Sequence, residues 1–293
     1  MGVYIVELKF KTFIHKTIHK DDENSDFPNS NTILGMLGNS LNKIKSDQET
    51  YEFIKNIKLS SLFPKIGNEY LIPKPLKLPE KIKPENFKKI KKAQYISISN
   101  LENWLKEHEI KTDNYTVRNT LPGVAIDRIN NTTALYLVSA LVAKEKFYFL
   151  VELPEEQKNN LEIALRISED EGLGGYRKTR GFGAFEFNII DSKNTIFEKF
   201  LNNKNYNYVL NLGMYIPTNE EINRINDNCY YKISEYRSFD TRSNGLKPTV
   251  RYFEEGSLFD FDIKGKIIKT TINESVISGT PIYLKVNWSD IDV

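Results

Sequence analysis

The segment Gly172-Leu-Gly-Gly-Tyr-Arg-Lys-Thr-Arg-Gly-Phe-Gly183 holds five of the fifteen glycines of this 293-residue chain. Glycines allow backbone amides to come close to a ligand, because no Cβ stands in the way. Other side chains of the segment suit a phosphate, by charge and hydrogen bonding, or offer a face on which a base stacks. These side chains are Arg177, Lys178, Arg180, Thr179, Tyr176 and Phe182. The segment therefore predicts a loop that lies along a polyanion, and RNA in particular.

Other kinds of glycine-rich loop fit this segment less well. The spacing excludes the dinucleotide fingerprint, because the next glycine after Gly174 and Gly175 is Gly181. The segment also follows a predicted helix and precedes a predicted strand at residues 184–190, which is the reverse of strand–loop–helix. A structural connector without a ligand stays open as the alternative, but such a connector would not need three cations.

Hydrophobic periodicity on both sides of the loop predicts an α+β fold. Residues 2–13 alternate as a strand, with Val3 and Ile5 on one face and Tyr4 and Val6 on the other. The elements that we expect after it are a helix with Asn31 or Thr32 as N-cap, a strand at 94–99, a helix at 101–108, short strands at 115–142 around a Leu121-Pro-Gly123 turn, a strand at 146–152, a helix from Pro154 to the loop, and a strand at 184–190. This order is the one that a ferredoxin-like (RRM-type) domain requires.

A second series of elements follows the first. We expect strands at residues 208–212, 230–236, 250–253 and 258–263, with a helix near 220–225. These suggest a second unit of the same kind, although no sequence repeat supports a duplication. We therefore divide the chain into residues 1–190, with a lysine-rich insertion at 65–92 whose front half is extended, and residues 191–293.

Bulk composition limits the classes of protein that fit. The chain is 40% hydrophobic and 27% charged, which is ordinary for a globular protein, and its net charge is only +2. A nucleic-acid surface must therefore be a local patch. The single cysteine, Cys229, excludes an internal disulfide and is expected to be a buried thiol. We find neither a signal-peptide core at the start nor an apolar run of membrane-spanning length, so we expect a cytoplasmic protein without a membrane partner.

Several segments together resemble the RAMP superfamily of CRISPR proteins. Residues 168–186, which include the glycine-rich loop, are similar to the glycine-rich loop of that family. Further similar segments occur in the same order: Phe27-Pro-Asn-Ser-Asn-Thr-Ile-Leu-Gly-Met-Leu37, Leu59-Ser-Ser-Leu-Phe-Pro64, Ala125-Ile-Asp-Arg-Ile129, Tyr215-Ile-Pro217 and Glu255-Gly-Ser-Leu-Phe259. More narrowly, the chain resembles the RAMP subunit that grips the 5′ tag of the guide RNA (crRNA) in type III-A (Csm) effector complexes, which serve antiviral defence.

The resemblance implies a structure and a set of partners. It implies two packed ferredoxin-like halves, with a hairpin "thumb" that residues 124–129 open beside a flipped nucleotide. It also implies three partners: the 5′ tag of the crRNA, the backbone RAMP subunit of the Csm complex, and the large polymerase-like signature subunit. In this reading the chain binds RNA and is not an enzyme.

Candidate RNA contacts lie in the glycine-rich loop, at the start of the first helix, in the thumb, near Lys247, and in the loop after the first strand. The glycine-rich loop offers Gly174, Gly175, Tyr176, Arg177, Lys178, Thr179, Arg180 and Gly181. Asn31 and Thr32 begin a helix whose free amides suit a phosphate, although simple N-capping explains them as well. The resemblance implies that Arg118 and Arg128 of the thumb segment contact the RNA backbone, although exposed or ion-paired strand side chains explain them as well. Lys247 and Arg251 share one face of an alternating segment, for which a solvated surface is the alternative.

The loop after the first strand holds the residues of the rival hypotheses. His15 and Lys16 are candidate RNA contacts, and His15 or His19 would serve a metal-independent RAMP endoribonuclease that processes repeat RNA. The acids Asp21, Asp22, Glu23 and Asp26 could hold Mg²⁺ but equally fit a flexible acidic loop. No His or Cys spacing suits zinc, so we predict no metal and no cofactor. A third hypothesis is a scaffold whose glycine-rich loop contacts protein.

Overall fold

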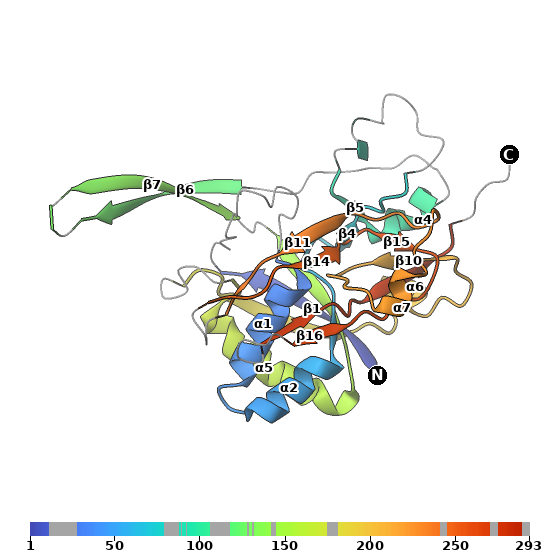
Figure 1. Cartoon of the computed structure of the whole chain (residues 1–293), viewed down its shortest axis with the longest axis horizontal. Helices are drawn as coiled ribbons and strands as arrows, with labels where there is room; N and C mark the ends of the chain where they lie inside the picture. The colour runs from blue at the N-terminus through green and yellow to red at the C-terminus, as the bar shows by residue number, and fades with distance from the viewer. Residues whose placement is uncertain are drawn as a thin grey trace.

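Two antiparallel sheets, one from each half of the chain, form the body of the protein (Figure 1). The structure is a computed structural model that describes residues 1–11, 28–78, 88, 90–91, 93–105, 118–127, 129–130, 132–141, 145–174, 181–240, 245–269 and 275–288. The predicted α+β class is confirmed, because helices and antiparallel strands both contribute to the described residues.

The first sheet is built around β1 (Gly2–Phe10), which pairs with β8 (Lys146–Leu153) on one side and β9 (Phe185–Asp191) on the other. Its strand order is β5-β4-β3-β8-β1-β9, with β2 also on β8. The remaining strands are β2 (Lys58–Leu59), β3 (Phe63–Ile66), β4 (Glu69–Pro73) and β5 (Tyr95–Ser97). The front of the predicted lysine-rich insertion is thus extended as expected, and it lies in the sheet as β3 and β4.

Two long helices, with α2 beside them, cover one face of the first sheet. They are α1 (Ser30–Leu41) and α5 (Lys158–Glu171), and they touch where the hydroxyls of Ser40 and Ser168 lie 2.9 Å apart. The helices separate the strands in the order strand–helix–strand–strand–helix–strand, and the inner strand order β3-β8-β1-β9 is that of a ferredoxin-like domain. The alternation of β1 was predicted correctly, because Tyr4 and Val6 face the helices and Ile5 faces the other side.

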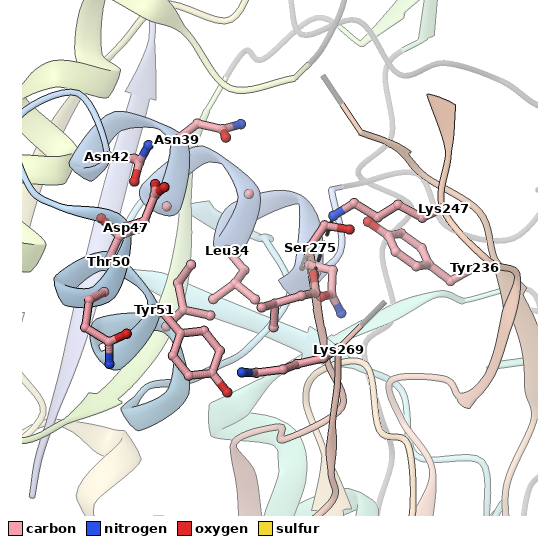
Figure 2. Close-up of a pocket in the computed structure, with 16 residues that line it drawn as sticks. Leu34, Asn39, Asn42, Asp47, Thr50, Tyr51, Tyr236, Lys247, Lys269 and Ser275 are labelled. Atoms are coloured by element: carbon pink, nitrogen blue, oxygen red, sulfur yellow. Dashed lines mark hydrogen bonds between the residues drawn. The ribbon is translucent and has the colours of Figure 1, made fainter. Parts of the chain in front are cut away.

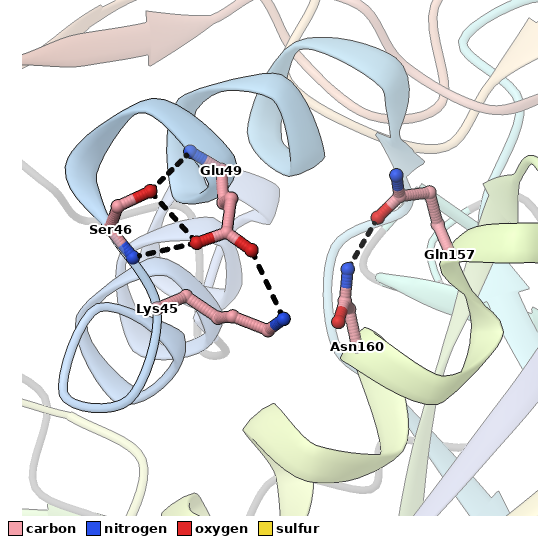
Figure 3. A network of polar contacts seen from close by, with 5 residues as sticks. All are labelled: Lys45, Ser46, Glu49, Gln157 and Asn160. Carbon is pink, nitrogen blue, oxygen red and sulfur yellow. Dashed lines mark hydrogen bonds and ion pairs between the residues drawn. The ribbon is translucent and has the colours of Figure 1, made fainter.

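Helix α2 (Asp47–Asn56) begins at a capping box, shown in Figure 3. The Ser46 hydroxyl accepts a hydrogen bond from the Glu49 N–H at 3.2 Å, and the Glu49 carboxylate accepts one from the Ser46 N–H at 3.0 Å. Hydrogen bonds from the Ser46 backbone and hydroxyl, together with Lys45, lower the pKa of Glu49 to about 2. Short helices complete the first half: η1 (Ile98–Asn100), α4 (Leu101–Leu105) and η2 (Glu155–Gln157).

The second half repeats the strand order of the first in a reduced form. β10 (Tyr208–Asn211) lies between β15 (Leu258–Phe259) and β18 (Tyr283–Val286), and Tyr230 bridges to the outer side of β15. The helix expected near 220–225 is a single turn, α7 (Asn219–Ile222), and α6 (Ile196–Leu201) precedes the sheet. Ribbons of two strands fill the remainder: β11 (Ile233–Tyr236) with β14 (Val250–Phe253), β12 (Phe239–Asp240) with β13 (Gly245–Leu246), and β16 (Ile267–Lys269) with β17 (Val276–Ser278).

The two sheets share one hydrophobic core. Ile5, Tyr148 and Leu150 from the first sheet belong to the same buried cluster as Leu210 and Leu284 from the second. Each of these side chains is at most 1% exposed. The halves are therefore packed sheet against sheet, and burial of this surface depends on residues from both ends of the chain.

The hairpin between α4 and β8 corrects one prediction. β6 (Arg118–Ile126) and β7 (Thr133–Leu141) pair over nine residues each, and Pro122 lies in the middle of β6 opposite Leu137. The Leu121-Pro-Gly123 turn was therefore wrong. Among the described strands β6 pairs with β7 alone, and a proline is tolerated on such an edge. The chain reverses instead after Asp127, whose carboxylate accepts the N–H of Ile129 at 2.9 Å.

The start of α1 corrects another prediction. Its N-cap is Asn29, whose side chain accepts a hydrogen bond from the Thr32 N–H at 3.0 Å. The predicted N-cap at Asn31 or Thr32 was therefore wrong by two or three residues. Ser30, Asn31 and Thr32 all lie inside the first turn, because Asn29 already supplies the acceptor that a cap needs.

Candidate nucleic-acid interface

The glycine-rich loop leaves the body through a narrow neck. The Leu173 N–H donates to the Gly183 carbonyl at 3.0 Å, and the Leu173 side chain is buried in the core beneath the helices. Gly183 has a φ of 82°, and a Cβ there would lie 2.2 Å from the Leu173 carbonyl oxygen. The two strands of the neck thus approach closely only because glycine occupies this position. The neck holds the loop at a fixed point between α5 and β9.

Three segments leave the first sheet at the edge where β1 ends. Phe10 pairs with Phe185 at the start of β9, and the Lys11 N–H donates to the Ala184 carbonyl at 2.8 Å, next to the neck. Lys11, the last described residue before His15, therefore lies beside the neck. β8 also begins at this edge, with Phe147 opposite Leu8, and only residues 142–145 separate it from the β6–β7 hairpin. In Figure 1 the hairpin projects far from the body.

A buried carboxylate lies just inside this edge. Glu7 is 4% exposed and accepts hydrogen bonds from the Tyr70 hydroxyl at 2.8 Å and from Lys65, while Lys146 approaches to 3.4 Å. Burial by itself raises the pKa of Glu7, but the hydrogen bonds and charges of its partners outweigh it, and the pKa lies below the ordinary value. The ionised Glu7 therefore offsets part of the positive charge of Lys65 and Lys146. Sequence reasoning missed this residue, and its only signal was a charge at an inward position of a buried strand.

Several of the segments that resemble the RAMP superfamily meet at the joint between the halves. The Ser30 N–H donates to the Ser61 hydroxyl at 3.0 Å, and the Met214 N–H donates to the Ser30 hydroxyl at 3.0 Å. The Ser61 hydroxyl in turn hydrogen-bonds the Glu255 carboxylate. Segments 27–37, 59–64 and 255–259 are thereby joined to the residues just before Tyr215. In this structure these segments therefore form packing contacts between the two halves.

Two predicted contacts on α1 point into this joint or into the helix cap. The Asn31 amide nitrogen donates to the Ser278 carbonyl at 2.6 Å, and the Asn31 amide oxygen accepts from the Ser278 N–H at 2.8 Å. The Thr32 hydroxyl donates to the Asn29 side chain at 3.1 Å. Both side chains therefore have protein partners in this structure.

The cationic candidates of the second half are more exposed. Arg251 on β14 is 80% exposed in its side chain and lies 3.5 Å from Glu235 on β11. Lys247 donates to the Val276 carbonyl at 3.4 Å and lines a cavity that Asn31 also lines. The ion pair of Arg251 with Glu235 is exposed to solvent and weak, so the charge of Arg251 stays accessible to a ligand.

Several candidates lie at or beyond the limits of the described residues. Gly174 and Gly181 lie at the two sides of the neck, and Arg118 begins β6 opposite Leu141. The remaining candidates fall outside the described residues: His15, Lys16, His19, Arg128, Gly175, Tyr176, Arg177, Lys178, Thr179 and Arg180, together with the acids Asp21, Asp22, Glu23 and Asp26.

Within the described ranges, His, Cys, Asp and Glu side chains form no group of three that could hold a metal ion. No helix in the part of the chain that the structure describes is long and apolar enough to cross a membrane.

Known proteins match both halves of the chain. A family model described as the RAMP superfamily matches residues 10–186, and one described as the CRISPR Csm4 C-terminal domain matches residues 204–286. A protein of Methanocaldococcus jannaschii named CRISPR system Cms protein Csm4 is 29% identical over an alignment of 334 positions, which covers 91% of this chain and 88% of the relative.

Solved structures share the fold over almost the whole chain. A chain of the Csm3–Csm4 subcomplex of a type III-A CRISPR-Cas interference complex superposes with a TM-score of 0.69 at 23% identity, covering 98% of this chain and all of that one. A chain of a Csm1–Csm4 cassette in complex with cA4 gives a TM-score of 0.63 at 19% identity, covering 98% and 99%.

Proposed function

This chain belongs to the RAMP superfamily, and we propose that it is the subunit of a type III-A CRISPR effector complex that holds the 5′ tag of the guide RNA. In this role it joins the backbone RAMP subunit to the large signature subunit, because chains of the same fold occur in Csm3–Csm4 and Csm1–Csm4 complexes. The assembly would serve antiviral defence in the cytoplasm.

The observation that carries the RNA-binding part is the shared edge of the first sheet. The loop after β1, the neck of the glycine-rich loop and the base of the β6–β7 hairpin all leave the body there. Segments that the sequence marks as RNA contacts thus start close together, as one strand of RNA would need. Arg177, Lys178 and Arg180 would neutralise phosphates, and Thr179 or Tyr176 would contact a sugar or a base.

RNA binding is tested by titrating the purified chain, alone and with its backbone partner, with a tag-bearing guide RNA and a scrambled control. The test variant is Arg177→Ala/Arg180→Ala, and the matched control is Lys55→Ala/Lys204→Ala, which removes the same charge from exposed positions. We expect preference for the tag, loss of affinity in the test variant only, and a salt dependence that becomes shallower by about one unit per cation removed.

Other outcomes would contradict the proposal. Equal RNA binding by the wild type and the test variant would place the site elsewhere, and an affinity that is independent of salt would exclude phosphate contacts. Loss of assembly with intact RNA binding by the assembled complex would favour the protein scaffold.

We further propose that this subunit has no catalytic role. The rival is the metal-independent endoribonuclease that uses His15 or His19. Incubation of the wild-type chain with repeat RNA without added metal should leave the RNA intact. Cleavage that is lost in His15→Ala or His19→Ala would overturn this part of the proposal.

A further inference from the structure

A cavity of about 540 Å³ separates the α1–α2 pair from the β16–β17 ribbon (Figure 2). Its walls come from the outer side of α1, the start of α2, the ribbon and Tyr236 on β11. The size is within the range of cavities that hold small organic ligands. The cavity lies along α1, on the side of the helix that faces β17 of the second half.

One end of the cavity offers acceptors and hydroxyl groups. Asn42, Asp47 and Thr50 lie together at this end in Figure 2. Thr50 is 5% exposed, and among the described residues its hydroxyl and the Asn42 amide oxygen have no hydrogen-bond partner although both atoms are buried. Buried polar atoms without a partner are costly, and a ligand that donates hydrogen bonds would satisfy them.

The other end of the cavity is cationic. Lys247 lies there in Figure 2, beside Ser275, and the Lys269 side chain runs from the same side toward Tyr51. The Lys269 ammonium lies 4.0 Å from the centre of the Tyr51 ring, which also lines the cavity. Two ammonium groups and an aromatic ring favour a ligand with an anionic group and a flat body.

The floor of the cavity is kept open by a glycine in the middle of α1. Gly35 lines the cavity, and a Cβ built there would meet no atom of the described residues within 4 Å. The packing of the protein therefore does not require glycine at this position, and glycine in a helix interior lowers helix stability. Room for a ligand against the helix backbone explains why a side chain is missing here.

From these contacts we infer that the cavity binds a single nucleotide whose base carries an exocyclic amino group. The amino group donates to Asn42 and Asp47, the base lies over Gly35 and beside Leu34 and Tyr51, and the phosphate meets Lys269. A simple anion would leave the acceptor end unused, and an apolar ligand would leave both ends unpaired. The inference goes beyond the proposed grip on the tag, and the nucleotide has two sources: a free mononucleotide, or one nucleotide of a bound RNA.

Calorimetric titration of the full chain with AMP, CMP, UMP and inorganic phosphate tests the inference. We expect AMP and CMP to bind, with UMP about tenfold weaker because uracil has no amino group, and phosphate too weak to compete. Lys269→Gln should weaken AMP about tenfold, whereas Lys204→Gln, an exposed lysine outside the cavity, should not. Gly35→Leu should abolish binding, and Gly35→Ala, which favours the helix, should weaken it without a folding defect.

A competition arm distinguishes the two sources. If guide RNA displaces bound AMP and Gly35→Leu weakens RNA as well as AMP, the occupant is a nucleotide of the RNA; if RNA and AMP bind together, it is a free nucleotide. No AMP or CMP binding at millimolar concentration, equal binding of phosphate, or unchanged AMP affinity in Gly35→Leu and Lys269→Gln would each overturn the inference. The affinity of the wild type for guide RNA is measured in the same experiment. A chain that binds AMP but not guide RNA would contradict the proposed function and leave the inference on the cavity standing.

Discussion

Asn31 on the first turn of α1 holds Ser278 of the second half through both edges of its amide. The nitrogen donates to the Ser278 carbonyl at 2.6 Å and the oxygen accepts from the Ser278 N–H at 2.8 Å. The pair fixes α1 against β17 with the geometry of a strand pairing. An asparagine that the sequence suggested as an RNA contact is therefore positioned to stabilise the joint between the halves.

Replacing Asn31 should weaken the joint. Asn31→Ala leaves both Ser278 groups without their partner, and we expect the free energy of unfolding to fall by about 2 to 3 kcal/mol. Asn39→Ala, at an exposed position of the same helix, should change it by less than about 0.5 kcal/mol. Urea unfolding measures both. Equal effects in the two variants would show that the amide pair does not support the joint, and tag binding by folded Asn31→Ala tests its RNA role.

The neck of the glycine-rich loop should tolerate substitution at one glycine and not at another. Gly183→Ala would place a Cβ 2.2 Å from the Leu173 carbonyl oxygen, so we expect a loss of roughly 3 kcal/mol or more. Gly181 also has a positive φ, of 76°, but a Cβ there meets nothing within 4 Å. Gly181→Ala should therefore cost only about 1 to 2 kcal/mol. Thermal unfolding of the two variants makes the comparison, and a smaller loss in Gly183→Ala would contradict the close approach.

Glu7 should contribute a pH-dependent part of the stability. Its pKa in the folded state lies below the ordinary value of 4.5, so its contribution is present above pH 4.5 and is lost as the pH falls through the folded-state pKa. Glu7→Gln leaves the partly buried Lys65 beside a neutral group and should cost about 3 kcal/mol at pH 7.

Unfolding free energies of Glu7→Gln and wild type should converge as the pH falls below 4.5. The control is Glu186→Gln, whose partner Lys11 lies 3.9 Å away on the surface, and it should change stability by less than about 0.5 kcal/mol. A constant difference between Glu7→Gln and wild type from pH 7 to pH 3 would argue against an ionised Glu7 in the folded protein.

The β6–β7 hairpin should matter for assembly and little for folding. Leu135 and Leu137 are 72% and 70% exposed, and on the same face lie Val124, opposite Leu135, and Pro122, opposite Leu137. Exposed apolar patches of this kind mark binding surfaces. Leu135→Ser/Leu137→Ser should change the free energy of unfolding by less than about 0.5 kcal/mol, but should reduce co-purification with the backbone subunit and guide RNA. Unimpaired assembly would show that this face has no partner.

Local sequence patterns predicted most of the first half. The alternation in β1, the apolar run of β8 and the helical period before Gly172 all reflect burial against one sheet, so they are visible in short windows. The errors came where context overrides a local signal. Pro122 suggested a turn, but it lies in β6, which pairs with β7 alone among the described strands. Asn31 and Thr32 suggested a helix cap, but Asn29 caps α1 before them.

The site could be predicted in its residue types but not in its geometry. The cations and glycines of residues 172–183 stand out by composition alone, and their grip on RNA stays a prediction. That the loop neck lies beside Lys11, or that Ser61 meets Glu255, depends on pairings between segments far apart in the sequence. A single sequence carries no signal for such pairings, because each partner is an ordinary polar residue in its own window.

The core shared by the two sheets has a consequence for how the chain is made. During synthesis the first sheet is complete once β9 has been translated, yet Ile5, Tyr148 and Leu150 keep one of its faces apolar. Phe197 of α6 and Leu210 of β10 cover part of that face, and the cover is complete only when Leu284 and Val286 of β18 leave the ribosome. The nascent protein therefore carries a partly uncovered apolar surface while the segment between β9 and β18 is translated, and ribosome stalling in this interval would leave it open to aggregation or chaperone capture.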